Sequence, residues 1–182
     1  EQMVGFRAIP NVHLYRPADA RETYAAWKAA LLSSQTPTIL VLTRQNLPLL
    51  AHSSEKGVEK GGYVLEANPK KRIQLLATGS EVSLCLAIQK ILLAKGVESE
   101  VVSLPCLEVF DKQSKEYQSS VLSLPKAKRY SFEMGAGLGW YKYADHVFSV
   151  EEFGRSAPGK DVLKAMGWTA DQLAAKVLSS LQ

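Results

Sequence analysis

The chain has 182 residues, of which 46% are hydrophobic and 22% charged, and it carries a formal net charge of +4 at pH 7. This is the composition of an ordinary soluble globular protein with room for one large or two small domains. No apolar run reaches membrane-spanning length and no segment has the pattern of a signal peptide, so we expect a cytoplasmic protein without membrane contact. The lysines and arginines are scattered, which argues against nucleic-acid binding and weakly favours small anionic substrates.

The first 46 residues predict a small β-α-β unit. A short strand is expected at residues 12–15, and Asp19 is a suitable N-cap for a helix that ends near Ser33. Residues 38–43, with the sequence TILVLT, carry no charge and are typical of a parallel strand buried on both faces. Such a unit is too small to be a domain by itself.

Residues 47–71 differ in character, because they contain Pro48, three glycines and several charges but little periodicity. We interpret them as a linker, with residues 62–65 adding an edge strand near its end. The chain is thus expected to have three parts. These are the remnant of one α/β domain at 1–46, the linker at 47–71 and a complete second domain at 72–182.

The clearest element of the second domain is a β-α-β unit. An apolar strand at 73–78 is followed by helical periodicity over 81–95, and Gly96 suits the left-handed position that ends a helix. The next strand is expected at 100–104. Because a helix connects the two strands, they must be parallel.

Further elements continue the α/β alternation to the end of the chain. They are a short helix around 112–122, strands at 129–132 and 147–150, and helices at 157–166 and 169–181, the last capped by Thr169. The predicted fold is therefore α/β, a three-layer, Rossmann-like, mostly parallel sheet with helices on both faces.

The turn between the strand at 73–78 and its helix is a candidate ligand site. Gly79 and Ser80 lie at the carboxyl end of a parallel strand and at a helix N-terminus, where open α/β sheets bind ligands. The structural alternative is that Thr78 or Ser80 caps the helix, Glu81 complements its dipole and Gly79 supplies a tight turn. A single glycine falls short of a dinucleotide fingerprint, so the structural reading is preferred.

Arg44 is the second candidate, because it follows the strand at 38–43 directly. Its guanidinium can hold a phosphate through two parallel hydrogen bonds. An ion pair with a neighbouring loop carboxylate is the structural alternative, and both remain open on the residues alone.

Other chemically notable residues point to structure. Cys85 and Cys106 lack metal or disulfide spacing and are expected to be free thiols, and no metal site is predicted. The segment GAGLG lacks the lysine and hydroxyl pair of a nucleotide loop, and we expect it to expose the aromatic residues that follow, at an interface. The aromatic residues Phe132, Trp140, Tyr141 and Tyr143 are assigned to packing or to subunit contact. The three histidines and the three tryptophans are assigned to the surface or to packing.

A series of short segments in order along the whole chain resembles the transketolase family. The segments are RAIPN, RPAD, TRQNLP, KGGYVL, ATGSEVSL, VVSLP, FDKQ, FEMGAGLGWYKYA, FGRSAP and a G-W-T turn. The resemblance covers the end of a pyrimidine-binding domain, a linker and a complete C-terminal domain. Because the chain begins without methionine, part-way through this pattern, it is expected to be a fragment.

The resemblance implies transfer of a two-carbon ketol unit from a ketose phosphate to an aldose phosphate, in the pentose phosphate pathway. It further implies thiamine diphosphate with Mg²⁺ or Ca²⁺ as cofactors of the parent enzyme and a homodimer with active sites at the subunit interface. The arginine that contacts the substrate phosphate in this family falls on Arg44. The family's metal-binding GDG segment, catalytic histidines and activating glutamate have no match here. We therefore expect no catalytic residue, no bound cofactor and no activity in the fragment alone.

Two alternatives remain. One is a related thiamine-dependent enzyme, such as the β-chain of a keto acid dehydrogenase or a deoxyxylulose phosphate synthase, although the RQNLP and FGRSAP segments argue against it. The other is a non-catalytic dimerisation module with a ligand at 78–81.

Overall fold

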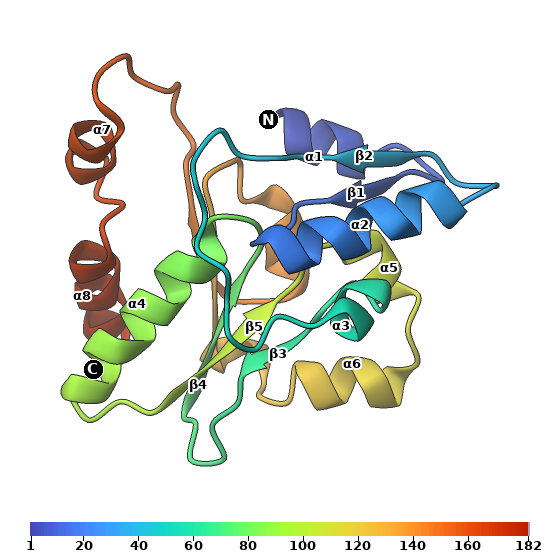
Figure 1. Cartoon of the computed structure of the whole chain (residues 1–182). Helices are drawn as coiled ribbons and strands as arrows, with labels where there is room; N and C mark the ends of the chain where they lie inside the picture. Colours follow the sequence, from blue (N-terminus) through green and yellow to red (C-terminus); the bar gives the residue numbers. More distant parts are fainter. Residues whose placement is uncertain (182) are drawn as a thin grey trace.

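The computed structural model describes residues 1–181 of the chain and contains two sheets (Figure 1). The larger has five strands in the order β3-β5-β4-β6-β7, of which β3 alone is antiparallel to its neighbour. The smaller pairs β1 with β2 in parallel. The strand bounds are β1 His13–Tyr15, β2 Thr38–Leu40, β3 Tyr63–Glu66, β4 Ile73–Ala77, β5 Ser99–Ser103, β6 Arg129–Glu133 and β7 His146–Ser149.

The predicted β-α-β unit is confirmed. Strand β4 leads into helix α4 (Glu81–Ala94), and β5 then pairs with β4 in parallel. Both strands are buried at every position, as expected for the centre of a parallel sheet. Gly96 has φ +77°, so it ends α4 in the left-handed conformation that glycine adopts without a Cβ clash.

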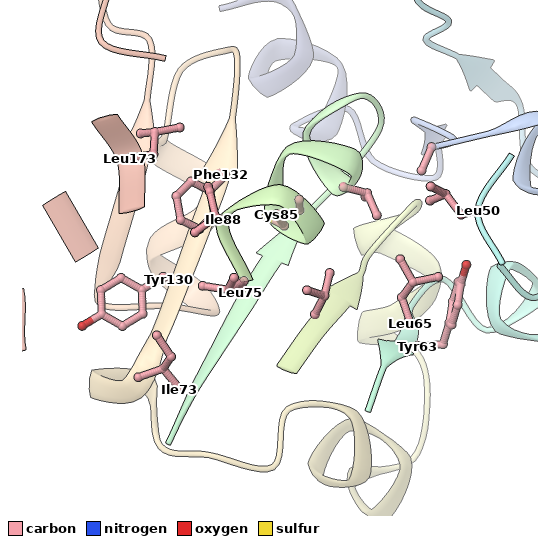
Figure 2. Close-up of a cluster of buried hydrophobic side chains, with 14 of the residues drawn as sticks. Leu50, Tyr63, Leu65, Ile73, Leu75, Cys85, Ile88, Tyr130, Phe132 and Leu173 are labelled. Atoms are coloured by element: carbon pink, nitrogen blue, oxygen red, sulfur yellow. The ribbon is translucent and has the colours of Figure 1, made fainter. Parts of the chain in front are cut away.

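Helices cover both faces of the five-stranded sheet, which confirms the predicted fold class. Leu75 of β4 points to one face, where α4 and α8 (Ala170–Ser180) pack (Figure 2). Leu76 points to the other face, toward helices α5 (Leu107–Asp111) and α6 (Lys115–Val121) and the 3₁₀ turn η2 (Leu138–Lys142). The remaining elements of this part are η1 (Lys126–Lys128) and α7 (Gly159–Ala165). Thr169 caps α8 through a capping box with Gln172, which confirms the prediction for that residue.

The N-terminal segment contains α1 (Gln2–Arg7) and α2 (Ala20–Leu32) in addition to β1 and β2. The prediction that Asp19 caps α2 is confirmed, since its carboxylate accepts the N–H of Glu22 at 2.8 Å. The prediction of a strand buried on both faces at 38–43 is wrong. Strand β2 ends at Leu40 and is half-buried, because it pairs only with β1 among residues 1–181, and Leu42 beyond it is 51% exposed.

The predicted linker contains a helix that its sequence did not reveal. Helix α3 (Glu55–Glu59) is capped by Ser54, whose hydroxyl accepts the N–H of Gly57 at 3.2 Å. A Cβ at Gly57 would lie 2.3 Å from the ring of Tyr63, so only glycine allows this close packing. The expected edge strand at the end of the segment is confirmed as β3, which pairs antiparallel with β5.

Of the aromatic residues after the GAGLG segment, Trp140 and Tyr143 pack in the core, so the expectation that this turn exposes them is wrong for these two and holds for Tyr141. Phe132 and Trp140 are fully buried and Tyr143 is 5% exposed, whereas Tyr141 is 57% exposed. The indole of Trp140 packs with Phe110 and Leu76 on one face of the sheet, so the 3₁₀ turn η2 directs this ring inward.

We predict that Trp140→Ala lowers the free energy of unfolding by about 3–5 kcal/mol, because it leaves a large cavity in the core. Tyr141→Ala, at the neighbouring exposed position, is the matched control and should change stability by less than about 0.5 kcal/mol. Urea unfolding of both variants measures the difference. Equal effects of the two substitutions would contradict the assignment of Trp140 to the core.

Candidate functional site

The five-stranded sheet has a topological switch point between β4 and β6. The chain leaves β4 toward β5 on one side and returns to β6 on the other. In such sheets, ligands bind at the carboxyl ends of the two strands that flank this point. Here the two strand ends carry Thr78 and Glu133, both fully buried.

Two arginines of the N-terminal segment fill this crevice. Arg16 follows β1, and its Nη1 donates to Thr78 Oγ1 at 3.0 Å and forms an ion pair with Glu81. Arg7, the last residue of α1, donates from Nη1 and Nη2 to the two carboxylate oxygens of Glu133 at 2.7 and 2.9 Å. We call Arg7, Arg16, Glu81 and Glu133 the four-charge cluster.

Glu133 is the central acceptor of this cluster. Besides Arg7, its carboxylate accepts the hydroxyl of Thr78 at 2.9 Å and the indole N–H of Trp140 at 2.6 Å. Arg16 Nη1 lies 3.6 Å from it. Burial alone would raise the pKa of Glu133, but the hydrogen bond and charge of Arg7 and the charge of Arg16 outweigh burial, so the pKa lies below its ordinary value. Glu133 is therefore held as a carboxylate in the protein interior.

The turn at 78–81 serves this cluster. Gly79 has φ +57°, which confirms the tight turn, and its N–H donates to the backbone oxygen of Arg16 at 2.9 Å. A Cβ at Gly79 would lie 2.9 Å from Cγ of Arg16, so glycine also allows the arginine to approach. Ser80 occupies the N-cap position of α4, as one of the two predicted candidates, but the prediction of a side-chain cap is wrong, because neither the Thr78 nor the Ser80 hydroxyl accepts a backbone N–H of the helix. The Thr78 hydroxyl donates to Glu133, and the Ser80 hydroxyl donates to Glu81 at 2.6 Å.

A cleft of about 160 Å³ lies beside the cluster and joins the two sites that the sequence suggested. The loop after β2 forms one wall and the turn before α4 forms the other. Its lining includes Arg16, Val41, Thr43, Gln45, Gly79 and Ser80. Arg44 lies between two lining residues but is itself exposed, and it forms no ion pair with any carboxylate in residues 1–181.

A second buried network joins the N-terminal segment to β3 and β5. Glu22 is fully buried, and its carboxylate accepts the hydroxyl of Tyr63 at 2.8 Å, the hydroxyl of Ser103 at 2.7 Å and the N–H of Ala18 at 2.7 Å. Burial raises the pKa of Glu22 above its ordinary value despite these hydrogen bonds. Unlike Glu133, Glu22 has no cationic partner among its hydrogen-bond donors.

Sequence reasoning missed Arg16 and Glu133, although a signal was present. Both residues stand at the carboxyl end of a strand, the same position that singled out Arg44. The sequence did not indicate that Arg16 of the N-terminal segment would lie close to Glu133 at the end of β6.

The remaining candidate ligands are dispersed. His52 pairs with Glu66 on the surface, and His146 stacks on Tyr130 with ring centroids 4.3 Å apart. Cys85 and Cys106 are both buried and free. Residues 1–181 hold no group of three or more histidine, cysteine or acidic side chains arranged to bind a metal ion. No helix in that range is long and apolar enough to cross a membrane.

The fold defines an α/β protein in which a doubly wound five-stranded sheet is joined, through the four-charge cluster in its crevice, to a small two-stranded parallel sheet. A family model described as the transketolase-like C-terminal domain matches residues 61–169, and the model of the transketolase pyrimidine-binding domain matches residues 1–49. The first match alone covers more than half of the chain. The chain belongs to the transketolase family.

Individual relatives agree with this assignment. A transketolase from Staphylococcus aureus is 45% identical over 98% of this chain and 28% of its own length. A Pichia stipitis transketolase, solved in complex with sedoheptulose-7-phosphate, matches with a TM-score of 0.93 and 43% identity over 98% of this chain and 26% of that one. A split-gene transketolase, described as an inactive β4 tetramer, has a TM-score of 0.77 and 28% identity over 97% of this chain and 60% of that one. The chain thus spans little more than a quarter of the length of the curated relatives it matches.

We predict that Glu133→Gln destabilises the chain by about 3–5 kcal/mol at neutral pH, because it leaves buried arginine charge without its partner. Because the folded pKa of Glu133 is lowered, its contribution is present above the ordinary value of 4.5 and is lost as the pH falls through the folded pKa. The stability difference between wild type and variant should therefore shrink on acidification below about pH 4.5.

Glu22→Gln is the matched control, because the contribution of Glu22 to stability changes with pH in the opposite direction. The pKa of Glu22 is raised in the folded chain, so wild type loses stability as the pH rises from 4.5 through the folded pKa, and the variant does not. Urea unfolding across the pH range measures both slopes. A Glu133→Gln difference that stayed constant or grew on acidification would contradict the charge assignment.

Proposed function

We propose that this chain supplies the carboxyl-terminal part of a transketolase that transfers a two-carbon ketol unit from a ketose phosphate to an aldose phosphate. The observation that carries the proposal is the pair of family matches in chain order, the pyrimidine-binding domain at 1–49 and the C-terminal domain at 61–169. The assignment of 1–46 to the first domain, 47–71 to the linker and 72–182 to the second is part of the proposal. So are a cytoplasmic location, a place in the pentose phosphate pathway and a homodimeric parent enzyme.

Thiamine diphosphate with Mg²⁺ or Ca²⁺ would supply the carbanion chemistry in the parent enzyme. The residues described here do not fit this group. The buried carboxylates of Asp19, Glu22, Glu81 and Glu133 are already taken by arginine, hydroxyl and backbone N–H donors. No metal-binding cluster occurs within 1–181. We therefore propose that this chain neither holds the cofactor nor catalyses by itself.

Arg44 is the proposed ligand of the substrate phosphate. Arg44 is exposed, forms no ion pair within the described residues and lies in the loop after the parallel strand β2, four residues beyond its end at Leu40 and not directly after it as the sequence suggested. A planar guanidinium with free N–H groups suits the oxygens of a phosphate. Gly79 and Ser80 line the cleft opposite its neighbours Thr43 and Gln45, so any contact that they make with a sugar would lie beside the Arg44 loop.

The split-gene relative bears on the fragment's assembly and activity. Its chain is matched over 60% of its length, and it is described as an inactive tetramer. This supports the proposal that a chain built from these parts can self-associate yet lacks activity.

A non-catalytic module that binds a ligand at residues 78–81 is less well supported, because Arg16 already contacts the hydroxyl of Thr78 and the carboxylate of Glu81.

We expect no saturable heat when the 182-residue chain is titrated with thiamine diphosphate and magnesium in a calorimeter. The physical reason is that the buried carboxylates already accept hydrogen bonds from protein donors or form ion pairs, and that residues 1–181 form no metal-binding cluster. A full-length transketolase titrated in the same buffer is the positive control. Saturable binding to the chain alone would show that a cofactor site exists within it and would refute this part of the proposal.

We also expect that Arg44→Ala, placed in a full-length transketolase carrying this segment, raises KM for a phosphorylated ketose about tenfold to a hundredfold, the usual contribution of a charge-assisted hydrogen bond. Arg44→Lys should recover only part of the loss, because lysine lacks the planar pair of donors. A ketol donor without phosphate is the matched control and should show an unchanged KM. An equal rise for both donors would count against phosphate recognition by Arg44.

A further inference from the structure

The loop that carries Arg44 has few restraints of its own. Residues 41–50 contain no helix or strand, and most of their side chains are exposed. Within the loop, the N–H of Gln45 donates to the hydroxyl of Thr43 at 3.1 Å, which is a local turn and fixes nothing beyond it. The position of Arg44 must therefore be set by what holds the two ends of the loop.

Both ends are tied to the same short segment, residues 15–19. At one end, the N–H of Val41 donates to the backbone oxygen of Tyr15 at 2.8 Å. At the other, the N–H of Leu50 donates to the carboxylate of Asp19 at 2.9 Å. Every residue from 15 to 19 is buried, so this segment anchors both ends of the largely exposed loop at 41–50.

Arg16, the second residue of this segment, contacts the C-terminal domain through both its backbone and its side chain. Its N–H donates to the backbone oxygen of Pro105 at 2.8 Å, and its own backbone oxygen accepts the N–H of Gly79 at 2.9 Å. Its guanidinium donates to the hydroxyl of Thr78 and forms an ion pair with Glu81 of the four-charge cluster. The side chain is only 11% exposed, so these contacts are made away from water.

We propose that Arg16 is a positioning residue for substrate phosphate binding: the C-terminal domain holds Arg16, Arg16 fixes residues 15–19, and these fix the loop that presents Arg44. The inference rests on the proposed role of Arg44. According to this proposal, the C-terminal domain contributes to phosphate recognition although none of its own residues contacts the phosphate. Arg16 acts through the loop, since the protein contacts of its Nη1 are Thr78, Glu81 and Glu133.

A residue that acts in this way has a distinct kinetic signature. A shift of about 1 Å in a binding group costs up to about a hundredfold, and the cost falls on interactions made by that group. Loss of Arg16 should therefore raise KM for phosphorylated donors and leave a phosphate-free donor and kcat nearly unchanged. A residue needed only for folding would lower the amount of active enzyme and reduce kcat for both donors alike.

The test compares Arg16→Met with Arg7→Met in a full-length transketolase carrying this segment. Arg7 is the matched control, because it is a buried arginine that pairs with Glu133 of the same cluster but belongs to α1 and not to residues 15–19. We expect both variants to melt at lower temperature. Only Arg16→Met should raise KM for the phosphorylated ketose, by about tenfold or more, with a change below about twofold for the phosphate-free donor.

Glu81→Gln decides the question if Arg16→Met does not fold, because it keeps the size of the side chain while removing the charge that Arg16 meets. It should give an intermediate rise in KM for the phosphorylated donor alone. An unchanged KM in the folded Arg16 or Glu81 variant, or an equal change for both donors, overturns the inference while leaving the role of Arg44 intact. If Arg44→Ala itself leaves KM unchanged, the proposed phosphate site fails and the positioning inference fails with it.

Discussion

The buried carboxylate of Glu133 is the constraint on which the arrangement of this chain depends. A carboxylate with no exposed surface must be matched by donors, because an unpaired charge in the interior would cost several kcal/mol. Besides the arginines, the described side-chain donors to Glu133 are the hydroxyl of Thr78, just after β4, and the indole of Trp140 in η2. The matching charge comes from Arg7 and Arg16, so the N-terminal segment must lie across the switch point. The crevice that a doubly wound sheet usually offers to a ligand is here filled by the chain's own arginines.

This arrangement changes how the C-terminal domain can be understood. Its strand order and its turn before α4 are those of a ligand-binding domain, yet the polar groups at that turn contact Arg16. The carboxyl ends of β4 and β6 therefore bind the N-terminal segment of the same chain, through Arg7 and Arg16. The 160 Å³ cleft that remains lies between the turn before α4 and the loop after β2. The contact between the C-terminal domain and the N-terminal segment therefore lies next to the proposed phosphate site.

Local features of the fold could be predicted from the sequence, and long-range ones could not. The β4-α4-β5 unit was predictable because the apolar period changes at Gly79 and again after Gly96. Helix α3 was missed because five residues are too few to show a helical period. The strand at 38–43 was predicted too long, since an apolar composition does not reveal whether partner strands are present.

For the site too, local features could be predicted and long-range contacts could not. Arg44 and Gly79 were singled out by position, whereas the Arg7–Glu133 pair joins residues 126 positions apart and leaves no local trace. For Trp140 the sequence left packing and subunit contact open, because an aromatic residue after a glycine-rich turn has the same sequence whether it points inward or outward.

The two strands of the small sheet differ in how their outer edges are protected. Along β1, the N–H of Leu14 donates to Glu108 and that of Arg16 donates to Pro105, so the C-terminal domain satisfies this edge. Strand β2 has no strand on its other side within residues 1–181. Open strand edges invite pairing between molecules. The short length of β2, three residues, limits how many such bonds a neighbouring chain could form. Within this small sheet, concentrated solutions of the segment are therefore prone to edge-to-edge association at β2 alone, through the outward-facing backbone groups of residues 38 and 40.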